Sequence, residues 1–411
     1  MHDVAIVGAG IVGLAVAAAL QDDGRQVLLL DRRGVAQEAS RGNAGALAFS
    51  DILPLASPGI MRYAPRWLLD PLGPLAIPPA YFPTILPWLL RFWRASRPDR
   101  ADASLAAQAG LMALAVMETP GMLDRAGAGH MVRRDGSLQL YESEAEWAAA
   151  LPGWQARARH GIAFEHVRGP RLAELQPGLH PRFIAGTYVP GWHTVSDPYD
   201  VACRLADHVT ARGGQIETRE VRTVAGAESS VQVQFVDGTT LLARRAVVAA
   251  GAWSKPLAQA LGDRIPLETE RGYNTTLPSS AFDLRRQLIF GGHGFVATPL
   301  STGLRIGGAV ELGGLKRPPN MARADAMLRR AAAFLPGLCV EGGRQWMGFR
   351  PSLPDSLPVI GPASATQHVI YAFGHGHLGL TQAAATGRIV ADLIAGRPPP
   401  LPLGSFRPTR F

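Results

Sequence analysis

A glycine-rich segment near the N-terminus could bind a pyrophosphate. It reads Gly8-Ala9-Gly10-Ile11-Val12-Gly13 and lies between two apolar runs, 4–7 and 14–20, which are typical of a buried strand and a buried helix. Gly8 would permit the tight turn, Gly10 would let the backbone approach the phosphates, and Gly13 would let helix and strand pack closely. The free N–H groups at the helix N-terminus, near Ile11 and Val12, would face the phosphates. The spacing predicts a dinucleotide-binding turn.

An acidic residue ends the next apolar run. Run 27–30 is followed by Asp31, whose carboxylate could accept hydrogen bonds from ribose hydroxyls. This favours a free 2′-hydroxyl and does not by itself separate FAD from NAD. Arg32 and Arg33 leave a choice open, because arginines here can hold a 2′-phosphate or simply face solvent.

Two later segments carry residue types suited to anions. Trp346-Met347-Gly348-Phe349-Arg350-Pro351 presents an arginine, whose planar fork of donors suits a carboxylate. Gly374-His375-Gly376-His377-Leu378-Gly379 precedes an apolar run, with Leu380 and Thr381 at its start, that predicts a helix. The two histidines have no cysteine or carboxylate ligands nearby in this glycine loop, so no metal site is expected.

The elements that must position these segments alternate along the chain. The first turn lies in a βαβ unit of about 30 residues, and Asp237-Gly238 is typical of a hairpin turn. Segment 130–195 predicts short strands and turns, and segment 265–312 predicts alternating strands. The other expected elements are helices at 105–125, 198–211, 323–334 and 380–395, and strands at 215–220, 230–235, 240–243, 246–250 and 368–373.

Composition bounds the class of protein. With 411 residues, of which 47% are hydrophobic, two domains are expected. The net charge is +8, and nearly all of the 41 basic residues are arginines spread in ones and twos. This predicts a solvated basic surface, or attraction of acidic substrates or an anionic membrane, and no nucleic-acid partner.

The cysteine count and the hydropathy of the chain indicate its cellular compartment. Cys203 and Cys339 are far apart and predict neither a disulfide framework nor a metal site. No uninterrupted apolar stretch reaches membrane-spanning length. The first predicted strand already begins at Val4, so no signal peptide is expected. The sequence therefore predicts a cytoplasmic protein.

Taken together, the motifs resemble the D-amino-acid oxidase (DAO) superfamily of FAD enzymes. The closest resemblance is to bacterial D-amino-acid dehydrogenases and, among these, to D-hydroxyproline dehydrogenases. Besides the first turn, four segments carry it along nearly the whole chain. They are Ser40-Arg41-Gly42-Asn43-Ala44-Gly45, Ala250-Gly251-Ala252-Trp253-Ser254, the 346–351 box with Leu357-Pro358-Val359-Ile360-Gly361, and the last glycine loop with its flanks, 373–381.

The resemblance implies how these segments bind FAD. Loop 40–45 would wrap the pyrophosphate and approach the flavin, with Arg41 and Asn43 as donors. Gly251 and Trp253 would lie in the second FAD turn, and Val221 would contact the adenine. The helix start near Leu380 would point at flavin N1 and O2 and stabilise the reduced flavin. Such a second glycine loop is expected for FAD and not for NAD. The 346–351 box contains no cysteine, so FAD is expected to be non-covalent.

The resemblance also implies catalytic residues. Arg350 would form a bidentate pair with the substrate carboxylate, and His377 or His293 could take a proton. Relatives of the glycine-oxidase type carry a tyrosine where this chain has Phe295, so Tyr273 is the expected substitute in contacting the carboxylate. Tyr273 could equally be an ordinary strand residue, and His193 is a similar, weaker candidate.

The implied fold is mixed α/β. A Rossmann-like FAD domain of the glutathione-reductase type would be assembled from 1–51, 196–262 and 340–411. A substrate domain with a large mixed, mainly antiparallel sheet and helices would comprise 52–195 and 263–339.

The implied reaction is oxidation of a D-amino acid to its imino acid by hydride transfer from Cα to flavin N5. Candidate substrates include D-proline and cis-4-hydroxy-D-proline, and electrons would pass to a quinone or another acceptor besides oxygen. Three alternatives remain: an amine oxidase of the sarcosine or glycine type, a flavoenzyme that modifies tRNA wobble uridines, and a flavin subunit of a heteromeric dehydrogenase.

A proline- and aromatic-rich stretch from about residue 52 has no evident catalytic content. Within it, segment 75–95 is apolar, rich in tryptophan and flanked by arginines. It could cover the substrate cavity, or it could rest on the inner face of the cell membrane next to a quinone. An oligomer is also compatible with the sequence.

Overall fold

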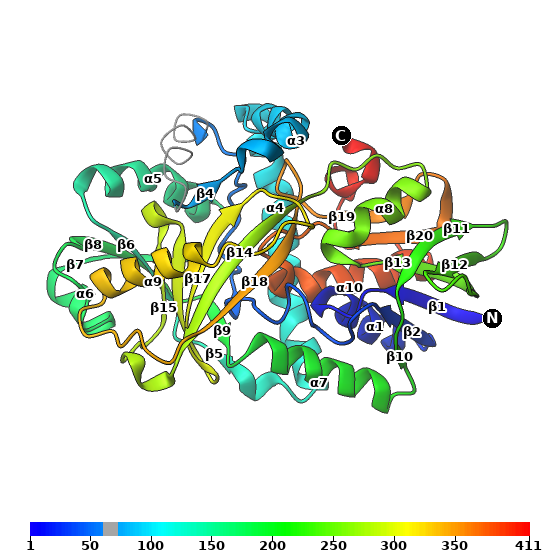
Figure 1. Ribbon diagram of the computed structural model, residues 1–411, viewed down its shortest axis with the longest axis horizontal. Helices are drawn as coiled ribbons and strands as arrows, with labels where there is room; N and C mark the ends of the chain where they lie inside the picture. Colours follow the sequence, from blue (N-terminus) through cyan, green and yellow to red (C-terminus); the bar gives the residue numbers. More distant parts are fainter. Residues whose placement is uncertain (61–72) are drawn as a thin grey trace.

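Two large β-sheets organise residues 1–60 and 73–411, which are the residues that the computed structural model describes (Figure 1). Residues Pro65, Trp67 and Pro71 of the proline- and aromatic-rich stretch lie outside the described residues. The first sheet lies with the two chain termini, and the second lies at the other end of the molecule. The mixed α/β class expected from the sequence is confirmed.

The first sheet has eight strands within the described residues, in the order β10-β2-β1-β13-β12-β11, with β20 beside β13 and β19 beside β20. The pairs of β1 with β2 and β13, of β2 with β10, and of β13 with β20 are parallel. The strands are β1 (His2–Val7), β2 (Val27–Asp31), β10 (Gln215–Thr218), β11 (Val221–Gly226), β12 (Val231–Phe235), β13 (Thr240–Val248), β19 (Val359–Ala363) and β20 (Thr366–Phe373).

Side chains alternate between the two faces of this sheet because the strand repeat is two residues. Val4 and Ile6 pack into a core with helices α1 (Ile11–Asp22), α7 (Pro198–Ala211) and α10 (Gly379–Ala395). Ala5 and Val7 face the opposite core, which includes helix α8 (Ser254–Ala260). Both faces are therefore covered, as the continuous apolar strand sequences require.

One expectation about this sheet is corrected. Residues 240–243 and 246–250 are not two strands, because β13 runs unbroken through Arg244 and Arg245. The first half of β13 pairs with β12 near the edge of the sheet, and only the second half is wholly buried. Polar side chains thus interrupt the apolar pattern without interrupting the backbone.

The second sheet has nine strands within the described residues, in the order β18-β14-β17-β16-β15-β6-β8-β7, with β4 beside β17. Helix α9 (Ala322–Phe334) packs against β14 and β17. The strands are β4 (Leu75–Ala76), β6 (Ser137–Tyr141), β7 (Glu165–Arg168), β8 (Ala185–Val189), β14 (Glu268–Leu277), β15 (Gln287–Phe290), β16 (Phe295–Leu300), β17 (Gly303–Glu311) and β18 (Arg344–Ser352).

Two helices were not expected in segment 130–195. These are α5 (Glu144–Arg159) and α6 (Gly169–Leu175). Pro152 and Gly153 lie inside α5, and both normally break helices. Its N-terminus carries a signal that could have revealed it, since the Ser143 side chain accepts from the backbone N–H of Glu146, as in a capping box.

Two further helices follow, α3 (Phe82–Ala95) and α4 (Pro98–Arg125); α3 contacts α4, and α4 packs on α10. Helix α4 begins seven residues before the expected start at 105. In the described part of the chain, no helix has the length and hydropathy needed to cross a bilayer.

Strands from distant parts of the chain tie the two sheets together. A small sheet joins β3 (Ala46–Leu47), β9 (His193–Val195) and β5 (Val132–Arg133). Segment 340–411 contributes to both large sheets, since β18 pairs with β14 while β19 and β20 lie in the first sheet. The division of the chain into two domains at the expected boundaries stays a prediction.

Candidate functional site

A cavity of about 610 Å³ brings the sequence motifs together. Most of the expected site residues line it: Gly8, Gly10, Ile11, Val12, Asp31, Arg32, Ser40, Gly42, Asn43, Ala44, Val221, Gly251, Trp253, Tyr273, Arg350, and all seven residues from Gly374 to Leu380, which include His375, Gly376, His377, Leu378 and Gly379. The expected residues outside its lining are Gly13, Arg41, Gly45, His193, His293 and Thr381.

The first turn needs its glycines for steric reasons. Gly8 has φ +115°, and a Cβ there would lie 2.4 Å from the carbonyl oxygen of Ala249. A Cβ on Gly13 would lie 1.9 Å from the carbonyl oxygen of Gly8, so Gly13 serves helix packing and not the cavity. The backbone N–H of Ile11 donates to Ser40 Oγ at 3.0 Å. The N-terminus of α1 and loop 40–45 thus meet at the cavity wall.

The carboxylate of Asp31 is fixed by backbone donors. Its two oxygens accept from the N–H groups of Ala9 and Arg33 at 2.9 and 2.8 Å. Arg32 forms an ion pair with Glu38, and its guanidinium lies 3.7 Å from the ring centroid of Trp253. A 2′-phosphate would have to compete with Glu38 for Arg32, so this geometry favours a cofactor with a free 2′-hydroxyl.

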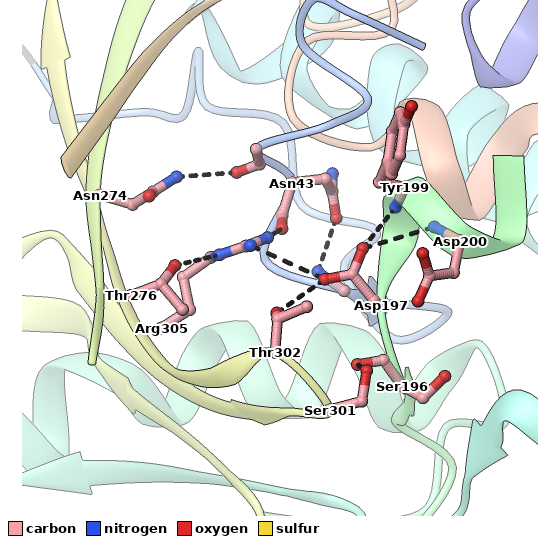
Figure 2. Close-up of polar contacts among 12 residues, drawn as sticks. Asn43, Ser196, Asp197, Tyr199, Asp200, Asn274, Thr276, Ser301, Thr302 and Arg305 are labelled. Carbon is pink, nitrogen blue, oxygen red and sulfur yellow. Dashed lines mark hydrogen bonds and ion pairs between the residues drawn. The ribbon is translucent and has the colours of Figure 1, made fainter. Parts of the chain in front are cut away.

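A buried arginine fastens loop 40–45 to the second sheet (Figure 2). Arg305 of β17 donates to the backbone carbonyl of Asn43 at 2.5 Å and to Thr276 Oγ1 at 3.0 Å, and it lies 3.8 Å from Asp197. Asn274 of β14 donates to the carbonyl of Gly42 at 3.0 Å. Asp197, Asn274 and Arg305 are 3%, 4% and 8% exposed. We call Asn43, Asp197, Asn274 and Arg305 the Arg305 clasp.

The clasp also fixes loop 40–45 internally. Asn43 Oδ1 accepts from the N–H of Gly45 at 2.8 Å and its backbone carbonyl accepts from Arg305, while its expected role as a donor to the cofactor stays a prediction. Arg41 points outward and donates to Gln37 at 2.7 Å. The sequence analysis missed Arg305 and Asn274, because single polar residues inside strands give no local signal.

The last glycine loop leads into α10 at the cavity. The N-terminus of α10 has no side-chain cap, which leaves N–H groups available to a ligand. His375 is 4% exposed, and its Nε2 lies 2.9 Å from Thr386 Oγ1. Burial lowers the pKa of His375 to about 3, so the ring is neutral at physiological pH. Thr381 accepts from the N–H of Ala48 at 3.0 Å and so fastens α10 to the segment after β3.

His377 faces a carboxylate that the sequence analysis did not identify. Its Nε2 lies 3.1 Å from Asp51 Oδ2, and Arg157 of α5 lies 3.6 Å from the other oxygen of Asp51. Asp51, Arg157 and His377 all line the cavity. Within the described residues, no group of three or more histidine, cysteine, aspartate or glutamate side chains could hold a metal ion.

Arg350 crosses the cavity wall over Gly272. A Cβ on Gly272 would lie 2.5 Å from Arg350 Cζ, so glycine leaves the space that the guanidinium occupies. Arg350 donates to the carbonyl of Ala309 at 3.3 Å, and this is its one hydrogen bond within the described residues. Burial lowers the pKa of Arg350, and the charge of Glu270 opposes this shift. The partly buried guanidinium therefore retains donors for an anionic ligand.

Three expected catalytic candidates are occupied by protein partners. The Tyr273 hydroxyl donates to Glu311 and accepts from the N–H of Asn320 at 3.2 Å, and burial and Glu311 raise the pKa of Tyr273. His293 pairs with Glu142. His193 packs edge-on against Phe49 with ring centroids 6.0 Å apart.

Of the three, only Tyr273 lines the cavity with Arg350, and its hydroxyl is engaged by Glu311 and Asn320. The structure places neither His193 nor His293 in the cavity lining, because each ring is held against neighbouring residues of its own region.

The residues present fit a dinucleotide cofactor. Two glycine turns, each followed by a helix N-terminus whose N-cap residue makes no side-chain cap hydrogen bond, open into one cavity. The lining draws on both large sheets. Asp31 and Val221 lie in strands of the first sheet, with Arg32 and Trp253 in adjoining segments, whereas Tyr273 and Arg350 lie in strands of the second.

Comparison with known proteins agrees with this arrangement. The family model "FAD dependent oxidoreductase" (DAO) matches residues 3–393. A D-amino-acid oxidase from Bradyrhizobium diazoefficiens is 35% identical over 99% of this chain and 98% of its own length. A D-amino acid dehydrogenase from Rhizobium johnstonii is 26% identical over 99% of both chains.

Solved structures share the fold. The glycine oxidase of Geobacillus kaustophilus superimposes with a TM-score of 0.78 at 22% identity, over 100% of this chain and 99% of that one. The L-proline dehydrogenase of P. horikoshii superimposes with a TM-score of 0.74 at 20% identity, over 100% of this chain and 97% of that one. At these identities the likeness extends to the architecture alone.

Proposed function

The chain belongs to the DAO family of FAD-dependent oxidoreductases, and on that premise we propose that it oxidises a D-amino acid to the corresponding imino acid. The observation that carries this proposal is Arg350, a partly buried guanidinium in the cavity wall that retains donors. An α-amino acid brings a carboxylate, which is the natural partner of such a group.

Arg350 selects the substrate by charge and geometry. A fork of donors pairs with both carboxylate oxygens, so the substrate has one orientation and one face of its Cα is turned toward the flavin. Gly272 leaves room for this arginine. One N–H group of Arg350 donates to the carbonyl of Ala309, a residue whose φ is +51°. Most of the catalytic effect then comes from positioning.

Non-covalent FAD fits the residues of the cavity. The turn with Gly8 and Gly10 would bind the pyrophosphate together with Ser40, Val221 would contact the adenine, and the N-terminus of α10 would stabilise the reduced flavin. FAD, when bound, accepts the hydride that leaves Cα. Neither Cys203 nor Cys339 lines the cavity, which supports attachment without a thioether.

The substrate class proposed is the D-amino acids, including D-proline and cis-4-hydroxy-D-proline. The relatives named as D-amino-acid oxidase and D-amino acid dehydrogenase support the D-configuration. They differ in electron acceptor, so a second candidate is an oxidase that returns electrons to oxygen. We propose the dehydrogenase, with a quinone as acceptor, because α3 offers a surface suited to the membrane.

Helix α3 exposes an apolar stripe. Phe82, Leu86, Leu90 and Trp93 are 45%, 40%, 51% and 47% exposed, and their spacing places them on one face of the helix. The opposite face packs on the protein through Ile85 and Trp88. Arginines at 91, 94 and 97 are exposed beside the stripe. This combination suits peripheral contact with the surface of an anionic bilayer. A quinone dissolved in the bilayer would then be close to the enzyme.

The decisive experiment is anaerobic reduction of the purified holoenzyme. We expect loss of the oxidised-flavin absorbance on addition of D-proline, cis-4-hydroxy-D-proline or D-alanine, and none with L-proline. Reduction by sarcosine or glycine without reduction by any D-amino acid contradicts the proposal. The reduced enzyme is then mixed with a soluble quinone or with oxygen. Faster reoxidation by the quinone indicates a dehydrogenase, and faster reoxidation by oxygen indicates an oxidase.

A further inference from the structure

A histidine–aspartate pair, His377 and Asp51, lines the same cavity as Arg350. The backbone N–H of Gly376 donates to the carbonyl of Pro351 at 2.7 Å, so the loop that carries His377 touches the strand end that carries Arg350. In an α-amino acid the carboxylate and the amine share one carbon atom. A substrate bound at Arg350 therefore has its amine only two bonds, roughly 2.5 Å, from the carboxylate carbon.

The surroundings of Asp51 favour its ionised form beside His377. Burial raises the pKa of Asp51, but the hydrogen bond and charge of His377 and the charge of Arg157 together lower it below its ordinary value. The backbone of Asp51 is held in place because Gln108 donates to its carbonyl at 3.0 Å. Arg157 is fixed in turn, since its Nε donates to the carbonyl of Ser50 at 2.9 Å.

The pair sets the tautomer of the imidazole. The acceptor at Nε2 is a carboxylate, so Nε2 carries the hydrogen and Nδ1 is left with a lone pair. The charged and titratable groups around His377 are Asp51 and Arg157, Arg350 on the neighbouring strand, and the neutral His375 on its own loop. The imidazolium that forms after proton uptake is stabilised by Asp51.

We propose that His377, oriented by Asp51, removes a proton from the ammonium group of the bound substrate. The inference rests on the proposed function. The N–H bond of the ammonium breaks, its electron pair stays on nitrogen, and a new N–H bond forms at His377 Nδ1. The neutral amine then assists departure of the Cα hydrogen as hydride to FAD, the oxidant of the proposed reaction. The proton leaves His377 to water, because the side chain is 38% exposed.

In this scheme His377 is a catalytic residue and Asp51 a positioning residue. General-base catalysis contributes on the order of 10²–10⁴ in rate. Without the base, the enzyme depends on the fraction of substrate whose amine is already neutral, and this fraction increases with pH until the substrate's own ammonium has titrated. A structural role for His377 predicts no such dependence on pH.

The test compares pH profiles of kcat/KM for the wild-type holoenzyme and His377→Gln, with the substrate that best reduces the wild type. We expect a loss of about 10²-fold near neutral pH that shrinks toward high pH. Imidazole added to His377→Ala should restore part of the rate. The exposed His160, at the end of α5, provides the matched control His160→Gln, whose profile should follow the wild type.

Asp51→Asn is the second variant. Its amide can still accept from Nε2–H, but the negative charge that stabilises the imidazolium is gone, so kcat/KM should fall near neutral pH and the loss should shrink toward high pH, as for His377→Gln. This variant decides the matter if His377→Gln does not retain FAD, which the flavin absorbance of the purified protein reports. Profiles of both variants that parallel the wild type at every pH overturn the inference. Failure of the wild type to react with any D-amino acid instead overturns the proposed function.

Discussion

The guanidinium of Arg305 donates a 2.5 Å hydrogen bond to the backbone carbonyl of Asn43, across 262 residues of sequence. This contact fastens the loop that follows the first βαβ unit to the second sheet. The same arginine lies beside Asp197, the N-cap residue of α7, so one side chain joins three segments. Closure of the cavity around FAD and packing of the two sheets therefore depend on the same buried group.

Arg305→Met should weaken FAD binding and destabilise the fold together. Loss of the charged hydrogen bond to loop 40–45 should raise the dissociation constant of FAD by about tenfold or more. Asp197 loses its buried counter-charge, which should lower the free energy of unfolding by about 3 kcal/mol. Flavin fluorescence on dilution and urea unfolding measure the two effects. Arg329→Met, an exposed arginine of α9, is the control, and equal FAD affinity in both variants would contradict a role for the clasp.

Arg350→Lys should retain FAD and lose substrate affinity. Lysine keeps the positive charge but lacks the planar fork, so one of the two carboxylate bonds is lost. Because a charged hydrogen bond contributes about 1.5–3 kcal/mol, KM for the D-amino acid should rise about 10- to 150-fold. Steady-state kinetics with a soluble acceptor and the flavin spectrum measure both properties. Unchanged KM in this variant would show that the carboxylate binds elsewhere.

The cofactor turn and Arg350 could be predicted from the sequence because their signals are short. The glycines of segment 8–13 are three spaced residues next to one strand, and steric contacts at Gly8 and Gly13 explain why no other residue fits. The expected roles of these residues toward cofactor and substrate stay predictions, but the cavity places them together.

The rest of the site could not be predicted, for two physical reasons. The partners of Arg305 lie far away in sequence, and a lone polar residue in a strand resembles any other. Arg157 was missed because α5 was missed: Pro152 and Gly153 favour a break, whereas packing of Trp154 into the core keeps the helix intact. In α5, tertiary packing overrides local propensity.

Buried His375 should make stability depend on pH. Its folded-state pKa of about 3 lies below the ordinary value of 6.5, so the unfolded chain binds a proton that the folded chain does not. The free energy of unfolding should therefore fall as pH decreases from 6.5 toward 3, by up to roughly 4 kcal/mol from this group. His375→Gln should remove that part of the dependence, as urea unfolding at several pH values can measure. Parallel curves for variant and wild type would refute the assignment.

The stripe on α3 should mediate contact with anionic membranes. Leu90→Glu places a charge in the centre of the stripe, where it opposes both apolar insertion and attraction to anionic lipid. Binding to vesicles of phosphatidylglycerol and phosphatidylcholine, measured by sedimentation, should fall at least about tenfold, since burying a leucine contributes about 1.5–3 kcal/mol.

Thr84→Glu is the matched control, since Thr84 is exposed on the same helix but outside the stripe. It adds the same charge to the same helix, so the comparison separates the effect of apolar insertion from the effect of net charge. Turnover with a soluble acceptor should be unchanged in both variants, because α3 contributes no residue to the cavity lining. Turnover with a quinone embedded in the vesicles should fall for Leu90→Glu alone. Equal vesicle binding by the two variants would mean that the basic surface, and not the stripe, meets the membrane.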